Sequence, residues 1–312
     1  MVYYDGGVSS IAMADNGNRE YRGPEVTRRR YMQGTAATGT GLAGMGTAGA
    51  QSPDLTIGGS ENFVDHVEAG ETALGMATGF ASMDSATVVG NHPAVDWVWV
   101  DTEHGSYDLY KARRIISVIP DDTAALVRIP GHHPREVDRV LDAGADGVIV
   151  PFLPRVDGPR VVEECENFVR QAYYPPDGNR GVAGGHAATL FGLETEEYLE
   201  TINDNVFVVL QVETRAMIDN IDEIAQIDGL DCLLIGPTDL SYQLGDPGNF
   251  ENPEFQQAIA NVLDASQRHG VAPGYWVGDE NEDEFIDDGW QILSLGADSG
   301  MLAAGIEARF PS

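Results

Sequence analysis

Basic residues are scarce in this sequence, and lysine is almost missing. The 312 residues contain 18 Lys and Arg against 50 Asp and Glu, giving a formal net charge of −32, and Lys111 is the sole lysine. No basic stripe is present to meet phosphates, which excludes nucleic acid as a partner. A surface this acidic repels itself in dilute buffer and is tolerated where salt screens it, so we predict a halophilic protein.

Cysteine and long apolar runs are also in short supply. Cys165 and Cys232 are the two cysteines, and neither belongs to a CxxC or another ligand spacing. Two unpaired structural thiols are therefore the favoured interpretation. The chain nowhere reaches the roughly 18 consecutive apolar residues that a membrane-spanning helix needs, so no spanning segment is expected.

The first 60 residues differ in composition from the rest. Three arginines at 28–30 precede a weakly apolar run over 33–47 and an A-x-A sequence at 48–50. This order is typical of a twin-arginine export signal, so we expect an exported protein. A disordered N-terminal tail on a cytoplasmic protein is the alternative, and residues 51–69 are expected to form a linker.

From about residue 70 to the end at 312, apolar runs alternate with amphipathic helical patterns. Eight βα units in about 240 residues match the count and size of a (β/α)8 TIM barrel, with a doubly wound α/β sheet as the alternative. The long connection over residues 154–205 is expected to place a functional loop over the barrel mouth. The eight apolar runs are Thr72–Thr78, Trp97–Thr102, Ala125–Pro130, Gly147–Leu153, Val206–Thr214, Cys232–Ile235, Val271–Val277 and Gln291–Leu295.

Polar side chains gather where these predicted strands end. In a TIM barrel the carboxyl ends of the strands converge at one mouth, where such folds carry their chemistry. A structural role is the alternative for each residue alone, but several at one rim favour a site. The residues are Asp101, Glu103 and His104 after the second run, Arg128 in the third, Glu213 at the end of the fifth and Asp239 after the sixth.

Glu213 and Asp239 end two consecutive strands that are joined by a helix-length segment, residues 215–226. This βαβ arrangement makes the strands parallel neighbours and puts both carboxylates at the same edge. Two acids placed together repel, so a proton, an arginine or a metal ion is expected to lie between them. Oxygen ligands favour Mg²⁺ or Mn²⁺ if a metal is present, and a structural salt bridge is the alternative.

The motifs resemble those of the HpcH/HpaI aldolases, which are metal-dependent pyruvate aldolases that cleave 4-hydroxy-2-oxo acids. The resemblance runs from about residue 70 to 304 and is specific because several motifs occur together. These are DTEHG at 101–105, LVRIPG at 126–131, RVLDAGADGVIVP at 139–151, YPPDGNRGV at 174–182, LQVET at 210–214 and GPTDLS at 236–241.

The resemblance implies a role for each matching residue in catalysis. His104 corresponds to the general base, acting directly or through water, and Asp142 to the acid that raises its basicity. Arg128 corresponds to the group that stabilises the transition state and holds the oxo acid. Asp101, which lies near the end of the second apolar run, is also assigned a catalytic role.

The resemblance also implies the ligands of the metal and the substrate. Glu213 and Asp239 correspond to ligands of a divalent ion, Mg²⁺ or Mn²⁺, with Co²⁺ as a further candidate. Gln211 and the backbone at Gly236 and Thr238 correspond to substrate contacts. Such an ion, chelated by the substrate carboxylate and keto oxygen, stabilises the developing enolate while His104 takes the C4 hydroxyl proton.

The position of the sole lysine argues independently against the other aldolase mechanism. A Schiff-base aldolase needs a lysine beside the substrate keto group. Lys111 falls in a helical pattern after DTEHG and not in any of the predicted strands. A metal-dependent mechanism is therefore expected.

The loop after Val182 departs from the family pattern. It lacks the arginines found in relatives that act on acidic semialdehydes, so a dicarboxylic substrate is not supported, and His186 is a candidate substitute contact. Two other functions stay open: a CoA-ester lyase of the citrate lyase type and an exported, non-catalytic oxo-acid-binding protein. A homo-oligomer formed through Met301–Ile306 is also expected.

Overall fold

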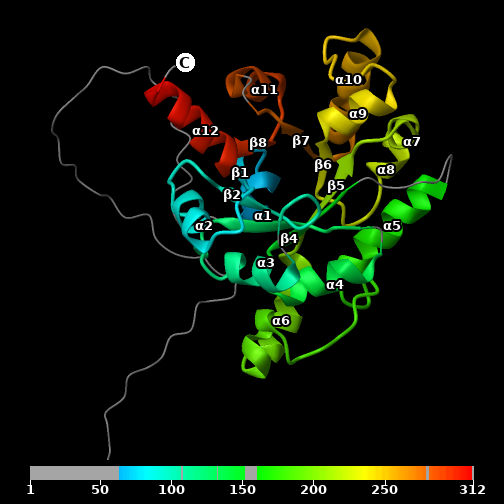
Figure 1. The fold of residues 1–312 in the computed structure, drawn as a ribbon. Coiled ribbons are helices and arrows are strands. Elements are labelled where there is room, and N and C mark those ends of the chain that lie inside the picture. Colours follow the sequence, from blue (N-terminus) through cyan, green and yellow to red (C-terminus); the bar gives the residue numbers. More distant parts are fainter. Residues whose placement is uncertain (1–62, 107, 132, 152–159, 279–280, 311–312) are drawn as a thin grey trace, which may run out of the picture.

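The computed structural model describes residues 63–106, 108–131, 133–151, 160–278 and 281–310. Eight parallel strands form a closed barrel in which β8 pairs with β1 (Figure 1). Each strand falls on one of the eight apolar runs, which confirms the predicted TIM barrel and excludes the doubly wound sheet. The strands are β1 (Ala73–Thr78), β2 (Trp97–Asp101), β3 (Ala124–Arg128), β4 (Gly147–Val150), β5 (Phe207–Val212), β6 (Cys232–Ile235), β7 (Ala272–Trp276) and β8 (Ile292–Ala297).

Helices alternate with the strands and surround the barrel (Figure 1). Within the described residues, no helix is long and apolar enough to span a bilayer. The α-helices are α1 (Phe63–Glu68), α2 (Met83–Gly90), α3 (Leu109–Ile116), α4 (Arg135–Asp142), α5 (Arg160–Ala172), α6 (Thr195–Thr201), α7 (Arg215–Asp219), α8 (Ile221–Ile224), α9 (Pro237–Gln243), α10 (Pro253–His269), α11 (Glu282–Asp288) and α12 (Asp298–Arg309), and the 3₁₀ segments are η2 (Ala187–Gly192) and η3 (Ile202–Asp204).

Successive side chains along each strand point alternately outward and inward, and this divides the hydrophobic core into two parts. One set of side chains packs between strands and helices, and the other fills the barrel interior. The interior contains Trp97, whose indole lies against Gly75: a Cβ added to this glycine would approach the ring to 2.1 Å. A glycine at this point of β1 therefore leaves room for the largest side chain of the interior. Cys165 and Cys232 are both free and buried, as predicted.

Three aspartates tie strands together at the amino-terminal end of the barrel. Asp96, Asp146 and Asp231 each stand immediately before an even-numbered strand. Each carboxylate accepts the N–H group of the preceding odd-numbered strand, at 2.7 Å from Leu74, 2.8 Å from Ala125 and 2.7 Å from Val208. The carboxylates thereby accept hydrogen bonds from backbone N–H groups near the strand starts. This matters because a buried N–H group without an acceptor destabilises the fold.

Helix α1 closes the amino-terminal end of the barrel. Phe63, Val64 and Val67 join the interior core, and the Phe63 ring packs edge-on against Phe207, the first residue of β5, at a centroid distance of 4.9 Å. This helix, Phe63–Glu68, lies at the end of the range predicted as a linker and packs as part of the barrel. The predicted export signal and the remainder of the linker lie outside the described residues.

The connection between β4 and β5 also differs from expectation. Its described part contains α5, η2, α6 and η3, and η2 packs on α4 while α6 and η3 face the loops that lead into β3 and β4. In Figure 1 the green α6 lies outside α3 and α4, away from the strands. The described part of this connection, from residue 160 onward, therefore covers the outer, amino-terminal side of the barrel, and residues 152–159 lie outside the described residues.

Candidate active site at the barrel mouth

The carboxyl-terminal ends of the barrel strands are here called the rim, and the predicted site residues lie at the ends of β2, β3, β5 and β6. Asp101 and Arg128 end β2 and β3 and are direct partners in the strand register. Gln211 and Val212 pair with Leu234 and Ile235, which brings the ends of β5 and β6 together. The parallel register thus gathers at one edge side chains that are far apart in sequence.

Arg128 occupies the centre of this rim. Its Nε and Nη2 donate to the two carboxylate oxygens of Asp101 at 2.9 and 2.6 Å, and its Nη1 lies 3.2 Å from a Glu103 oxygen. Nη1 also donates to Oε1 of the buried Gln211 at 3.5 Å, and the guanidinium stands 4.9 Å above the Trp99 ring. The bidentate pair and the stacking fix a positive charge that is only 12% exposed.

The neighbours of Arg128 change its pKa and the pKa values of the carboxyls beside it. Burial opposes the ionisation of Asp101, but the hydrogen bonds and charge of Arg128 outweigh it and lower the Asp101 pKa. Burial raises the pKa of Glu103, with a further contribution from the charges of Asp101 and Asp239. Burial also disfavours the Arg128 cation, yet Asp101, Glu103 and Glu213 together raise its pKa. Arg128 is therefore a permanent cation at the rim.

Glu213 and Asp239 lie where the βαβ argument predicts. Glu213 follows β5 and is 3% exposed, whereas Asp239 is exposed in the first turn of α9, which follows β6. The connecting helix is broken at Asn220 into α7 and α8. Gly236 makes room for the Glu213 carboxylate, because a Cβ at this glycine would lie 2.5 Å from a Glu213 oxygen.

These carboxylates fit a hard divalent cation. Asp101, Glu103 and Glu213 surround Arg128, and Asp239 lies close enough to act on Glu103, so the ionised rim carries excess negative charge. Magnesium is typically held by one or two carboxylates with the substrate and water completing its octahedron. No cluster of three or more His, Cys, Asp or Glu side chains is arranged for a metal in the described residues. Glu213 and Asp239 are the two carboxylates that would hold such an ion, with its remaining positions open to substrate oxygens and water.

His104 and Asp142 are not brought together within this chain. The His104 side chain is 72% exposed and its Nε2 lies 3.7 Å from the Glu103 carboxylate. Asp142 ends α4, accepts a hydrogen bond from Arg180 at 2.8 Å and lies 3.5 Å from Nε2 of His186. A helix of eight residues carries the chain about 12 Å back from the rim, so its last residue lies toward the opposite end of the barrel.

Three residues at the rim were not identified as site candidates from the sequence. Trp99 and Trp276 meet edge-to-face at 5.4 Å and form an aromatic floor under Arg128. Asp298 begins α12 after β8 and accepts the N–H groups of Gly79 and Phe80, at 2.7 and 3.2 Å, and the hydroxyl of Ser85. Asp298 thus ties β8 to the end of β1. Asp298 could have been identified from the sequence because it directly follows an apolar run. Trp99 and Trp276 could not, because tryptophans within apolar runs are typical of a hydrophobic core.

The two remaining predictions concern Thr238 and the lysine. Thr238 is exposed at the start of α9, with its carbonyl accepting from the Ser241 hydroxyl at 2.7 Å, so its backbone borders the rim beside Asp239. Lys111 is exposed on α3 and lies on no strand of the barrel. The chain therefore has no lysine in its barrel interior, which argues against a Schiff-base mechanism.

Comparisons with known proteins agree with the fold. The profile of the HpcH/HpaI aldolase/citrate lyase family matches residues 80–304. The 4-hydroxy-2-oxo-heptane-1,7-dioate aldolase of Salmonella typhimurium is 32% identical over 248 residues, which cover 79% of this chain and 92% of that protein.

Solved structures of proteins from the same family also resemble this chain. An HpcH/HpaI aldolase/citrate lyase family protein from Burkholderia cenocepacia superimposes with a TM-score of 0.73 at 29% identity, covering 79% of this chain and 96% of that one. The HpcH/HpaI aldolase from Desulfitobacterium hafniense superimposes with a TM-score of 0.69 at 28% identity, covering 80% and 96%.

Proposed function

The chain belongs to the HpcH/HpaI aldolase/citrate lyase family, and on this premise we propose that it is a divalent-metal-dependent aldolase. Its proposed substrates are 4-hydroxy-2-oxo acids, and its products are pyruvate and an aldehyde. The observation that carries the proposal is the fixed Arg128 cation with Glu213 beside it, at a rim where Asp239 follows the neighbouring strand. A permanent cation and a cation-binding acid pair together suit a substrate with adjacent carboxylate and keto oxygens.

Arg128 and Gln211 position the oxo acid in this proposal. The guanidinium is held rigidly by Asp101, so it needs little reorganisation when negative charge develops on the keto oxygen. Gln211 is buried beside it, and its amide is available to orient the substrate. A divalent ion held by Glu213 and Asp239 would supply a Lewis acid for the same oxygen.

His104 is the proposed base. Its imidazole accepts the proton of the C4 hydroxyl, the C3–C4 bond breaks, and the electron pair passes to C3 to give pyruvate enolate and the aldehyde. Protonation of C3 completes pyruvate. Within one chain the carboxylate in contact with His104 is that of Glu103, whose raised pKa reflects burial and the charges of Asp101 and Asp239.

The test is a coupled pyruvate-release assay in multimolar KCl, with 4-hydroxy-2-oxo acids of several lengths and with Mg²⁺, Mn²⁺ or a chelator. We expect metal-dependent release that is lost in Glu213→Gln and His104→Ala and falls about a hundredfold or more in Arg128→Lys, which cannot keep the bidentate pair. The exposed His92→Ala is the control and should keep full activity. No release by folded, metal-supplemented protein overturns the proposal and redirects attention to CoA esters or to binding without turnover.

Two further expectations remain proposals. Helix α12 exposes Met301, Leu302 and Ile306, and Phe310 follows it with 69% exposure, which supports association of copies through this helix. Size-exclusion chromatography with light scattering measures the oligomer, and Leu302→Glu with Ile306→Glu should dissociate it. Export is measured by cell fractionation and N-terminal sequencing of the recovered protein, with an arginine-to-lysine pair at positions 28–29 as the control.

A further inference from the structure

The rim is charged on one side and apolar on the other. The charged side chains lie at the ends of β2, β3, β5 and β6, whereas β7, β8 and β1 are neighbours on the remaining side of the closed barrel. Trp276 ends β7, Ala297 ends β8, and Ala77 lies one residue before the end of β1. All three pack with the hydrophobic interior, and Trp276 and Ala297 stay partly exposed. Together with Trp99 on β2, these residues are here called the apolar sector.

Small side chains on β1 and β8 let two tryptophans meet in the apolar sector. Trp99 and Trp276 belong to strands that β1 and β8 separate, yet their rings lie edge to face with centroids 5.4 Å apart. In the strand register Ala77 lies between Trp99 and Ala297, and Ser294 on β8 is the partner of Trp276. Larger residues at these positions would fill the space that the two indoles use, because protein interiors are closely packed. The sector therefore offers an aromatic surface where the other side offers charge.

The apolar sector begins one aromatic ring away from the proposed position of the oxo acid. The Arg128 guanidinium lies 4.9 Å from the centroid of the Trp99 ring, and Trp276 contacts the same ring. In the proposed function, the substrate carboxylate and keto oxygen lie beside Arg128 and Glu213. The group that the substrate carries on C4 therefore extends away from these charges, toward Trp276.

The charges of the rim disfavour a second carboxylate on this C4 group. Arg128 is the sole Lys or Arg among the eight strand-final residues, and Asp101 and Glu103 already neutralise it. Asp298 follows β8 but is 7% exposed, and its oxygens accept the N–H groups that follow β1 and the Ser85 hydroxyl. In the described part of the rim, an acidic C4 group thus meets repulsion from carboxylates without a free cation to offset it.

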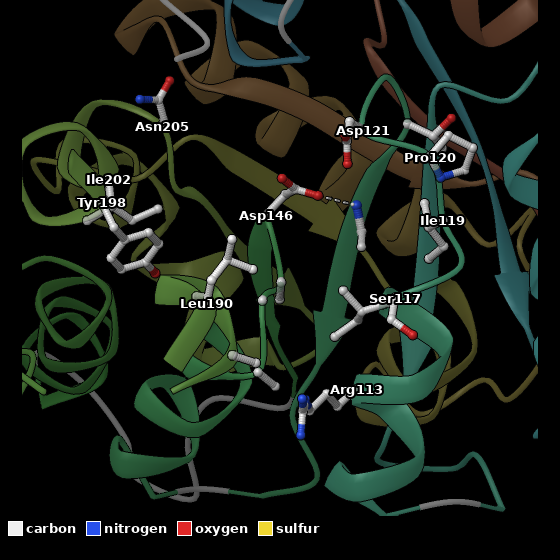
Figure 2. Close-up of a pocket in the computed structure, with 18 of the residues that line it drawn as sticks. Arg113, Ser117, Ile119, Pro120, Asp121, Asp146, Leu190, Tyr198, Ile202 and Asn205 are labelled. Atoms are coloured by element: carbon white, nitrogen blue, oxygen red, sulfur yellow. Dashed lines mark hydrogen bonds between the residues drawn. The ribbon is translucent and has the colours of Figure 1, made fainter. Parts of the chain in front are cut away.

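A hollow elsewhere in the molecule lies too far from the rim to receive the C4 group. Figure 2 shows this hollow, of about 470 Å³, beside Tyr198 and Ile202. Its wall includes Asp146, which precedes β4 and accepts the Ala125 N–H at 2.8 Å, the bond drawn as a dashed line. The hollow therefore lies at the amino-terminal end of the barrel, opposite the rim. A group carried by an oxo acid at Arg128 has to bind within the rim itself.

We propose that the apolar sector selects the aldehyde, and that the substrates carry an uncharged aromatic group on C4. This inference rests on the proposed aldolase function, because it concerns the part of the same substrate that the charged side of the rim does not bind. Trp276 is the specificity-determining residue, and its ring packs against the aromatic group while Arg128 and Gln211 hold the oxo acid. Aromatic pairs of this kind gain from edge-to-face or offset stacking as well as from burial. The released aldehyde is then aromatic, with benzaldehyde as the simplest example.

Cleavage of three substrates tests the inference and the proposed function separately. 4-Hydroxy-2-oxo-4-phenylbutanoate carries a phenyl group on C4, 4-hydroxy-2-oxopentanoate carries a methyl group, and 4-hydroxy-2-oxo-heptane-1,7-dioate carries a chain that ends in a carboxylate. We expect kcat/KM for the phenyl substrate to exceed both others by about tenfold or more, since burial and stacking of the ring both contribute. An equal or higher kcat/KM for the methyl substrate or the dioate overturns the inference and leaves the aldolase function standing.

Substitutions at Trp276 assign the preference to the apolar sector, because the intrinsic reactivity of each substrate is the same for every variant. Trp276→Ala should lower the ratio of kcat/KM for the phenyl and methyl substrates about tenfold, chiefly through a higher KM for the phenyl substrate. Trp276→Phe keeps an aromatic ring and should retain most of the ratio. Circular dichroism shows that each variant is folded. An unchanged ratio in folded Trp276→Ala refutes the assignment.

Ligands that cannot be cleaved give a second readout, which needs no turnover. 2-Oxo-4-phenylbutanoate lacks the C4 hydroxyl, and 2-oxopentanoate has a methyl group in place of its phenyl ring. In calorimetric titrations with Mg²⁺ or Mn²⁺ present, the wild type should bind the phenyl ligand at least about ten times more tightly, and Trp276→Ala should remove this difference. Equal affinities in the wild type overturn the inference. Tighter binding of the phenyl ligand, with no cleavage of any of the three substrates, overturns the aldolase function alone.

Discussion

Replacing Asp231 by Asn should flatten part of the pH dependence of folding stability. Asp231 stands before β6, accepts the Val208 N–H at 2.7 Å and lies 3.5 Å from the Tyr173 hydroxyl. Burial raises the pKa of its carboxyl from 3.8 to about 7. Asparagine keeps an acceptor for Val208 but does not titrate, so the variant removes one ionisation and retains the tie between strands.

The sign and size of the effect follow from this pKa. Because the folded pKa lies above the unfolded one, the folded chain binds the proton more tightly, and this contribution to stability is lost as pH rises through about 7. Between pH 5 and 8 a single group with these pKa values changes the unfolding free energy by about 2.5 kcal/mol. Asp231 keeps part of its surface in contact with solvent, so we expect about 1–2 kcal/mol.

Urea unfolding at constant KCl, followed by tryptophan fluorescence at several pH values, measures this difference. The unfolding free energy of Asp231→Asn minus that of the wild type should rise by about 1–2 kcal/mol from pH 5 to 8. Asp146→Asn is the matched control, because it removes an aspartate from the equivalent position before β4. Parallel pH profiles for the wild type and Asp231→Asn would refute the reasoning, since they would show that Asp231 ionises as easily in the folded chain as in the unfolded one.

Two other substitutions probe packing and burial. Arg180→Met should destabilise the fold by about 2–3 kcal/mol, measured by urea unfolding, because it removes the buried partner of Asp142. Gly75→Ala should cost about 2 kcal/mol or more because its methyl group would clash with the Trp97 indole, whereas Gly305→Ala on α12, where nothing lies within 4 Å, should be neutral or slightly stabilising in the same urea experiment.

The strands and the rim could be predicted from sequence because each depends on local pattern. A β-branched apolar run such as Val206–Thr214 has few alternatives to a buried parallel strand, and the topology then places Glu213 and Asp239 together. Arg128 was identifiable for the same reason, as the single charge in an apolar strand.

What the sequence could not provide depends on tertiary packing. Asp142 belongs to a motif that matches the family, but its distance from His104 is set by the direction of α4 and not by the motif. Helix α1 occupies a region that composition alone marks as a linker, and only its contact with Phe207 shows that it closes the barrel. The left-handed turn ends at Gly192, but its first two positions are Leu190 and Phe191, residue types that do not signal a left-handed conformation.

The exposed Lys111 makes this protein unusually simple to modify chemically. Amine-reactive reagents at mildly alkaline pH have one side-chain target in the entire sequence, besides the terminal amine. That target lies on α3, next to Tyr110 and two residues before Arg113. A fluorophore or a surface tether can thus be attached at a single defined point on the outside of the barrel, leaving the rim untouched.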